Sequence, residues 1–433
     1  MSTTTPTPNP ATHKPRHLAK ASNYAVIGRS RLLAQLQKKT TELAQTTNFP
    51  TLTAFLPQHF FVWFSNYLKS VFNGKYKPFP VYPAGESGVY PLRAANGGNV
   101  IKIAIAGDWG TGTVESQEVA NSMSGERPDY TLHLGDVYFV GGPPEINENC
   151  LGHSANGYTG VTWPHGSHGS FAMNGNHEMY CGGGAYFKIF LPTLGIAHPR
   201  QKQLTSFFCL ETPYWRILAL DTGYNSVGLP ILGAIPGINK LSFVGANCRL
   251  EDGQIAWLRG LKLQQNIKPT LVLSHHQYYS SFPEEVYTVP AKQLAEFFPN
   301  QEIVWMWGHE HRMAIYDKFS NSAGGGLRAY GRCLGHGGMP VSVSNPQNID
   351  VSQAPLTFYD ASTHHLTDKT LVGRNGYVMM TLDGYALTFD YRDNKNQPMF
   401  KERFVGQADG TITNSHDALP EGGLTAVVKS QKL

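Results

Sequence analysis

The stretch IKIAIAGDWGTG, residues Ile101–Gly112, decides the fold. Its apolar run is short and rich in isoleucine, which is typical of a β-strand buried on both faces. The run stops at a glycine, and the next residue, Asp108, carries a carboxylate into a loop. Because ligands of open α/β sheets bind beyond the carboxyl ends of the strands, Asp108 is a candidate ligand.

Four later segments repeat the apolar run that ends on a polar side chain, and three of them have a glycine in between. They are LHLGDVYF (Leu132–Phe139), FAMNGNHE (Phe171–Glu178), TLVLSHHQ (Thr270–Gln277) and IVWMWGHEH (Ile303–His311). Each reads as a buried strand that ends on Asp, Asn or His. The pattern therefore predicts an α/β fold in which several strand ends meet at one metal cluster. The candidate ligands are Asp108, Asp136, Asn176, His275, His309 and His311.

This donor set is chemically specific. Two carboxylates, one amide and three imidazoles suit zinc, manganese or iron better than calcium or a thiolate cluster. Asp108 and Asp136 would repel each other if they converged without a cation. A pair of divalent ions about 3.5–4 Å apart, bridged by one carboxylate, removes that problem and stabilises an in-line displacement. His309 and His311 are two residues apart, so each can serve a different ion.

A glycine precedes several candidate ligands, which predicts sharp turns with positive φ that free the ligand from its strand. These glycines are Gly107, Gly135, Gly175 and Gly308. Two further segments carry structural predictions only. YWRILALDTG reads as a strand that ends on Asp221, which we interpret as a turn cap. GYVMMTLDGYALTFDYRD, Gly376–Asp393, predicts a hairpin with Asp-Gly at its turn.

Composition narrows the class of protein. The 433 residues are 41% hydrophobic and only 15% charged, with 45 glycines, which favours a loop-rich globular fold. The net charge of +4 and the absence of Lys/Arg runs argue against an extensive nucleic-acid surface. Five widely spaced cysteines predict no disulfide framework. With no signal peptide and no apolar stretch long enough to span a membrane, we expect a cytoplasmic protein.

The chain divides into three parts. Residues 1–20 predict a disordered tail, residues 21–97 an N-terminal helical extension, and residues 98–433 a catalytic domain that includes the C-terminal β-strands. The extension contains the aromatic segment FLPQHFFVWFSNYLKSVF. It suits a helix packed on the main domain, or a contact through residues 50–75 with a membrane surface or a second copy of the chain.

GDWG, GDVYF, GNHE, VLSH and GHEH follow, in order, the five motif blocks of the calcineurin-like metallophosphoesterases. The opening GDWG most resembles the purple acid phosphatase branch. The resemblance spans Gly107 to His311. It implies a four-layer α/β sandwich of two mixed β-sheets flanked by helices, with the metals at the strand ends. It also implies binuclear metal-dependent hydrolysis of phosphate mono- or diesters by a metal-activated hydroxide.

The resemblance assigns roles residue by residue. Asp108, Asp136 and His311 would hold the first metal, and Asp136, Asn176, His275 and His309 the second, with Asp136 bridging. The two ions would be divalent or mixed-valence iron, manganese or zinc. His177 would contact the phosphate and protonate the leaving oxygen. His276, Tyr138 and His336 are candidate contacts for a small phosphate-ester substrate, and for His276 a supporting role behind the ligands is equally open.

One departure from the family bears on the first metal. The purple branch has a tyrosine three residues after the second aspartate, where this chain has Phe139, and Tyr138 lies one position earlier. We expect this shift to turn the ring away, leaving three protein ligands and water, unless a local bulge brings Tyr138 back. The same departure supports an alternative hypothesis, a catalytically weakened scaffold that binds a protein or a membrane surface.

Overall fold

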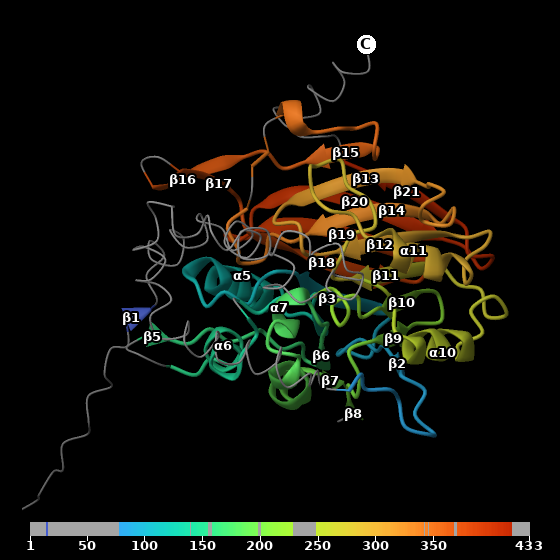
Figure 1. The fold of residues 1–433 in the computed structure, drawn as a ribbon, viewed down its shortest axis with the longest axis horizontal. Coiled ribbons are helices and arrows are strands. Elements are labelled where there is room, and N and C mark those ends of the chain that lie inside the picture. The colour runs from blue at the N-terminus through green and yellow to red at the C-terminus, as the bar shows by residue number, and fades with distance from the viewer. Residues whose placement is uncertain are drawn as a thin grey trace, which may run out of the picture.

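The computed structural model describes residues 14–15, 78–138, 140–154, 158–197, 201–227, 248–341, 343–344, 346–367 and 370–417. Most of the predicted tail, the extension up to residue 77 and the proposed contact at residues 50–75 lie outside these ranges, as does Phe139. Two mixed β-sheets dominate the fold (Figure 1).

The first sheet has nine strands in the order β21-β20-β19-β18-β3-β4-β6-β7-β8. Strands β3, β4 and β6 run parallel in its centre, and the remaining pairs are antiparallel. The bounds are β3 Val100–Ala106, β4 Tyr130–His133, β6 Gly169–Ala172, β7 Ile196–Ala197, β8 Gln201–Lys202, β18 Gly376–Asp383, β19 Ala386–Asp393, β20 Pro398–Gly406 and β21 Ile412–His416. The predicted hairpin is confirmed as β18–β19, which closes at the pair Asp383 and Ala386.

The second sheet has eight strands in the order β15-β13-β14-β12-β11-β10-β9-β2. Strands β10, β11, β12 and β14 are parallel. The bounds are β2 Val89–Pro91, β9 Phe208–Glu211, β10 Arg216–Ala219, β11 Thr270–Ser274, β12 Glu302–Trp307, β13 Met313–Phe319, β14 Arg328–Leu334 and β15 Leu356–Tyr359. Edge strand β2 comes from the 21–97 segment, and the domain boundaries themselves stay a prediction.

Two further pairs are short: β1 Lys14–Pro15 with β5 Tyr158–Thr159, and β16 Thr363–Thr367 with β17 Thr370–Gly373. The helical elements are α5 Val114–Gly125, α6 Pro143–Asn149, α7 Asn176–Met179, η2 Tyr186–Phe190, α8 Leu191–Leu194, α10 Asp252–Gly260, α11 Thr288–Ala295 and η4 Pro346–Asn348. Within the described ranges, we find no helix with the length and apolar character that crossing a membrane requires.

Three apolar clusters define four layers. Ile103 and Ile105 of β3 face the second sheet and share a cluster with Leu271 and Leu273 of β11. The alternate residues of β3 are the small Ala104 and Ala106, which belong with α5, α6, η2 and α8 in the outer cluster of the first sheet. Helices α10 and α11 cover the outer face of the second sheet. The predicted four-layer α/β sandwich is therefore confirmed.

The layers bring strand ends together. The loops after β3, β4 and β6 in the first sheet and after β11 and β12 in the second all start at carboxyl ends of parallel strands. Since the inner faces of both sheets pack on one core, these loops meet along one edge of the sandwich. The candidate ligands Asp108, Asp136, Asn176, His275, His309 and His311 all follow these strand ends.

Candidate metal centre

Two buried aspartates anchor the site. Asp108 follows β3 and Asp136 follows β4, and neither side chain is exposed to solvent. Both residues, together with His309 after β12, have positive φ values of 56°, 74° and 65°. Left-handed backbone is unusual for residues other than glycine and is concentrated at functional sites. The turn that aims each side chain inward is thus made by the candidate ligand itself.

The four glycines that precede candidate ligands, Gly107, Gly135, Gly175 and Gly308, mainly allow close contact between loops. Of the four, only Gly135 has positive φ, so the prediction of left-handed turns was wrong for Gly107, Gly175 and Gly308. A Cβ added at Gly308 would lie 2.6 Å from Asp108 Oδ2, and one added at Gly175 would collide with Asp136 Oδ1. Gly308 thus lets a loop of the second sheet approach a loop of the first, and Gly175 lets two loops of the first sheet approach each other.

Tyr138 points into the cluster. Its hydroxyl lies 2.5 Å from Asp108 Oδ1, 3.0 Å from Asp136 Oδ2 and 3.3 Å from His311 Nε2. The expectation that the one-residue shift turns the ring away was wrong. Asp136 has left-handed backbone with φ 74°, and Val137 after it forms a β-bridge with Gly110, so the direction of the Tyr138 ring follows this local turn rather than the alternation of an extended strand.

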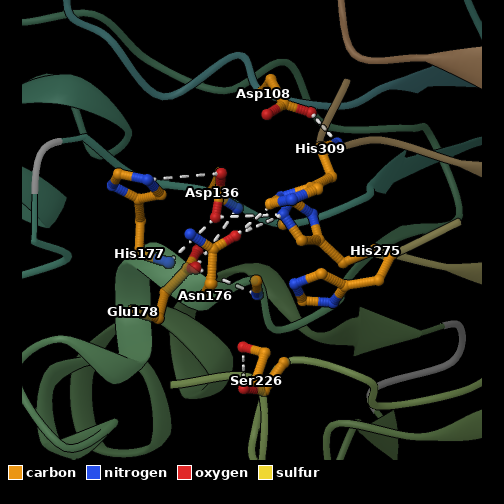
Figure 2. Close-up of polar contacts among 12 residues, drawn as sticks. Asp108, Asp136, Asn176, His177, Glu178, Ser226, His275 and His309 are labelled. Atoms are coloured by element: carbon orange, nitrogen blue, oxygen red, sulfur yellow. Dashed lines mark hydrogen bonds and ion pairs between the residues drawn. The ribbon is translucent and has the colours of Figure 1, made fainter. Parts of the chain in front are cut away.

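The GNHE segment joins the cluster through α7. Asn176 Oδ1 lies 3.0 Å from both His275 Nε2 and His309 Nδ1. The backbone N–H of His177 donates to Asp136 Oδ1 at 3.0 Å, and Figure 2 shows the His177 ring facing the same carboxylate. The buried Glu178 accepts hydrogen bonds from the N–H groups of Gly175 and Asp136. Burial, with Asp136 beside it, raises the pKa of Glu178.

Three histidines come from the second sheet. His275 Nδ1 donates to the Leu134 carbonyl at 2.9 Å, which leaves Nε2 facing Asp136 Oδ1 at 3.2 Å (Figure 2). Burial alone would lower the pKa of His275, but the Asp136 carboxylate raises it to about 9. His309 donates its backbone N–H to Asp108 Oδ2 at 2.7 Å. His311 Nε2 lies 3.3 Å from Asp108 Oδ1.

The remaining predicted residues lie at different places around this core. His177 Nε2 is 3.8 Å from Asp136 Oδ2, and its ring packs between Tyr138 and Tyr180. His276 is buried beside His309, with ring centroids 4.5 Å apart, and burial lowers its pKa. His336 follows β14 and is fully buried, which lowers its pKa to about 4. Within the described ranges, neither ring nitrogen of His336 makes a hydrogen bond.

The donors fit a cation. Ligand atoms of Asp108, Asp136 and His275 all lie within 4.8 Å of one another, and so do those of His275, His276 and His309. The ion-pair partners that the structure gives the two carboxylates are imidazoles. Buried carboxylates this close are stable when paired or when they coordinate a metal. The buried Asp/His cluster could therefore hold a metal ion.

Sequence reasoning missed the residues that hold the loops in place. Asp221, interpreted as a turn cap, does accept the Tyr224 N–H, but it also accepts from Ser206 and Asn174. Asn174 belongs to the strand exit that leads into GNHE. Thr222 contacts the loop of the adjacent histidines 275 and 276. The available signal was the strand-to-Asp pattern of LALDTG, which like TLVLSHHQ has the apolar run and the polar end but no glycine between them.

Comparison with known proteins gives one family. Residues 101–313 match the family model described as calcineurin-like phosphoesterase. Similar solved structures include GAP50, the anchor in the inner membrane complex of Plasmodium, at 13% identity and a TM-score of 0.44, covering 72% of this chain and 91% of that one. PhoD is similar at 12% identity and a TM-score of 0.45, covering 77% and 74%. None of the curated proteins matches this sequence.

Proposed function

Because residues 101–313 match the family model of calcineurin-like phosphoesterases, we propose that this chain hydrolyses phosphate esters with the help of two transition metal ions. The observation that carries this proposal is the convergence of Asp108, Asp136, Asn176, His275, His309 and His311 in one cluster. A mixed set of oxygen and imidazole donors suits iron, manganese or zinc. When bound, such ions stabilise the negative charge that develops on a phosphoryl group.

We assign Asp136 to both ions. Its Oδ1 faces His275, and its Oδ2 faces the Tyr138 hydroxyl, so its two oxygens look toward the two halves of the cluster. Asp108 and His311 complete the first half, and Asn176 and His309 the second. The Leu134 carbonyl supports this assignment, because its hydrogen bond from Nδ1 holds the His275 ring with Nε2 turned toward the cluster.

Tyr138 belongs in the first half of the site. Its hydroxyl contacts Asp108, Asp136 and His311, the three residues assigned to the first ion. A phenol in that position supports a purple acid phosphatase-like centre, as the GDWG block does. We therefore propose Tyr138 as a fourth protein ligand there in place of water.

His177 handles the proton of the leaving group. Its ring is held by Tyr138 and Tyr180, and its Nε2 faces Asp136. An imidazole N–H at the rim of the cluster can donate to the oxygen that leaves the phosphoryl group, which typically contributes 10²–10⁴-fold to a rate. The hydrogen bond from the backbone N–H of His177 to Asp136 Oδ1 fixes where the His177 imidazole lies relative to that carboxylate.

The experiment measures metal content and hydrolysis together. The purified chain, loaded with manganese, zinc or iron, should bind two ions and cleave a nitrophenyl phosphate mono- or diester. Asn176→Ala should lose one ion and the activity. The control His364→Gln, at an exposed position of β16, should retain two ions and full activity. Wild-type turnover in Asn176→Ala would refute the assignment. One ion or none, with no turnover in any metal, would support the catalytically weakened scaffold instead.

A further inference from the structure

Thr222 makes three hydrogen bonds to one short loop. It lies just beyond β10 and is fully buried. Its Oγ1 accepts the backbone N–H of His275 at 3.2 Å and that of His276 at 3.1 Å. The same oxygen lies 3.1 Å from Nδ1 of His276. The side chain of His276 is therefore tied to a residue from the neighbouring strand.

Counting protons fixes the tautomer of His276. A threonine hydroxyl has two lone pairs and one proton. The two backbone N–H groups occupy both lone pairs of Thr222, so its proton is the group that bonds Nδ1 of His276. Nδ1 thus accepts and carries no proton. A neutral imidazole with an accepting Nδ1 carries its proton on Nε2.

The ring nitrogens of the two adjacent histidines consequently have opposite hydrogen-bonding roles. His275 donates from Nδ1 to the Leu134 carbonyl, which leaves Nε2, facing Asp136, as the atom at which a metal would replace a proton. His276 accepts at Nδ1 and presents an Nε2–H, which cannot coordinate a cation. Although ligand atoms of His275, His276 and His309 lie within 4.8 Å of one another, only two of these imidazoles are prepared to bind metal.

The Nε2–H of His276 is a buried donor that makes no hydrogen bond among the described residues. Its ring is wedged between His309 and Tyr287, with centroids 4.5 Å and 4.8 Å away, so it cannot swing out to find another partner. Leaving a buried donor unsatisfied is costly, so such a group in a native structure calls for an explanation, of which a catalytic role and a bound ion are two. An anionic oxygen is an acceptor that such a donor binds strongly.

We propose that His276 donates a hydrogen bond to a nonbridging oxygen of the bound phosphoryl group, and that Thr222 is the positioning residue that keeps His276 a donor. The inference rests on the proposed function and adds to it an anion contact separate from the metal ligands. It applies equally to a phosphate ester and to inorganic orthophosphate, because both present the same oxygens.

The test measures orthophosphate binding by calorimetry on the full-length, metal-loaded protein, with bound metal quantified in each sample. His276→Leu removes the donor and His276→Gln keeps an N–H. Thr222→Val removes the hydroxyl and Thr222→Ser keeps it. A hydrogen bond to a charged group predicts about a tenfold to hundredfold weaker orthophosphate affinity in His276→Leu and Thr222→Val. We expect His276→Gln and Thr222→Ser to recover most of it, and all four variants to keep two metals.

Two results would overturn the inference. Loss of one metal in His276→Leu would make His276 a ligand, and wild-type orthophosphate affinity in that variant would exclude the anion contact. If His276→Leu fails to fold by circular dichroism, the comparison of Thr222→Val with Thr222→Ser decides in the same way. A wild-type protein that binds neither metal nor orthophosphate refutes the proposed function, and the inference with it. If the wild type binds both metal and orthophosphate, failure of the His276 contact refutes only this inference and leaves the proposed function standing.

Discussion

Replacing Asp136 by Asn separates its place in the fold from its proposed place between two metals. Without metal, the variant loses the attraction between Asp136 Oδ1 and His275 Nε2, 3.2 Å apart, which costs about 1.5–3 kcal/mol. It also loses the repulsion between Asp136 and Asp108, whose oxygens lie within 4.8 Å. That repulsion is worth about 3.5 kcal/mol at an effective dielectric constant of ~20. The two terms nearly cancel, so the metal-free stability should change by less than about 2 kcal/mol.

Metal should reveal the difference. Two sites filled at a hundredfold excess over Kd stabilise the wild type by about 5 kcal/mol, which for a chain of this size raises Tm by roughly 6–8 °C. Asp136→Asn should show almost none of this increase. The assay is thermal unfolding of both proteins with and without a chelator, with metal content measured in parallel. An equal metal-dependent increase in Tm for both proteins would refute the bridging position of Asp136, whatever the activity.

Three further predictions concern the surroundings of the cluster. When loaded with iron(III), the wild type should show a visible phenolate-to-iron absorption band that Tyr138→Phe lacks, and a colourless wild type would exclude Tyr138 as a ligand. Burial raises the pKa of Asp221 to about 6 from an ordinary 3.8, so the folded protein keeps a proton that the unfolded chain releases. The free energy of unfolding should therefore fall as pH rises from about 4 to 6, by up to about 3 kcal/mol. Urea unfolding at several pH values should show a flatter dependence of stability on pH in Asp221→Asn than in the wild type, and identical pH profiles would contradict this. Gly175→Ala should cost about 1–3 kcal/mol because its Cβ collides with Asp136, whereas Gly184→Ala, where a Cβ meets open space, should cost nothing in the same unfolding assay; equal costs would refute the close-approach argument.

The fold was predictable because the residue pattern of its central strands indicates which face of each strand is packed against what. In β3 the large isoleucines at 103 and 105 alternate with the small alanines at 104 and 106, and the structure puts the first pair between the sheets and the second under the helices. The hairpin β18–β19 was equally explicit in its Asp-Gly turn. What the sequence did not contain was the spatial order of the strands, because pairing partners such as β3 and β18 are far apart along the chain.

The site was predictable to the extent that its residues lie directly after strands. Asp108 and His309 fit that rule, and the structure places them in contact. Residues that act across loops were not predictable from their own surroundings in sequence. Nothing around Thr222 indicates that its hydroxyl serves the next strand, and the direction of Tyr138 depends on the conformation of the segment after Asp136 rather than on its distance from a motif.

The origin of the donors makes the packing of the two sheets part of the proposed chemistry. The oxygen donors Asp108, Asp136 and Asn176 follow strands of the nine-stranded sheet, and the imidazoles of His275 and His309 follow strands of the eight-stranded sheet. Neither sheet alone offers a complete set for iron, manganese or zinc. A metal bound here would tie the two sheets at one edge, while the apolar core holds them along their faces. Loosening the core between the sheets, far from any ligand, should therefore weaken metal binding before it unfolds either sheet, because binding free energy that depends on two bodies is lost when their relative position is no longer fixed.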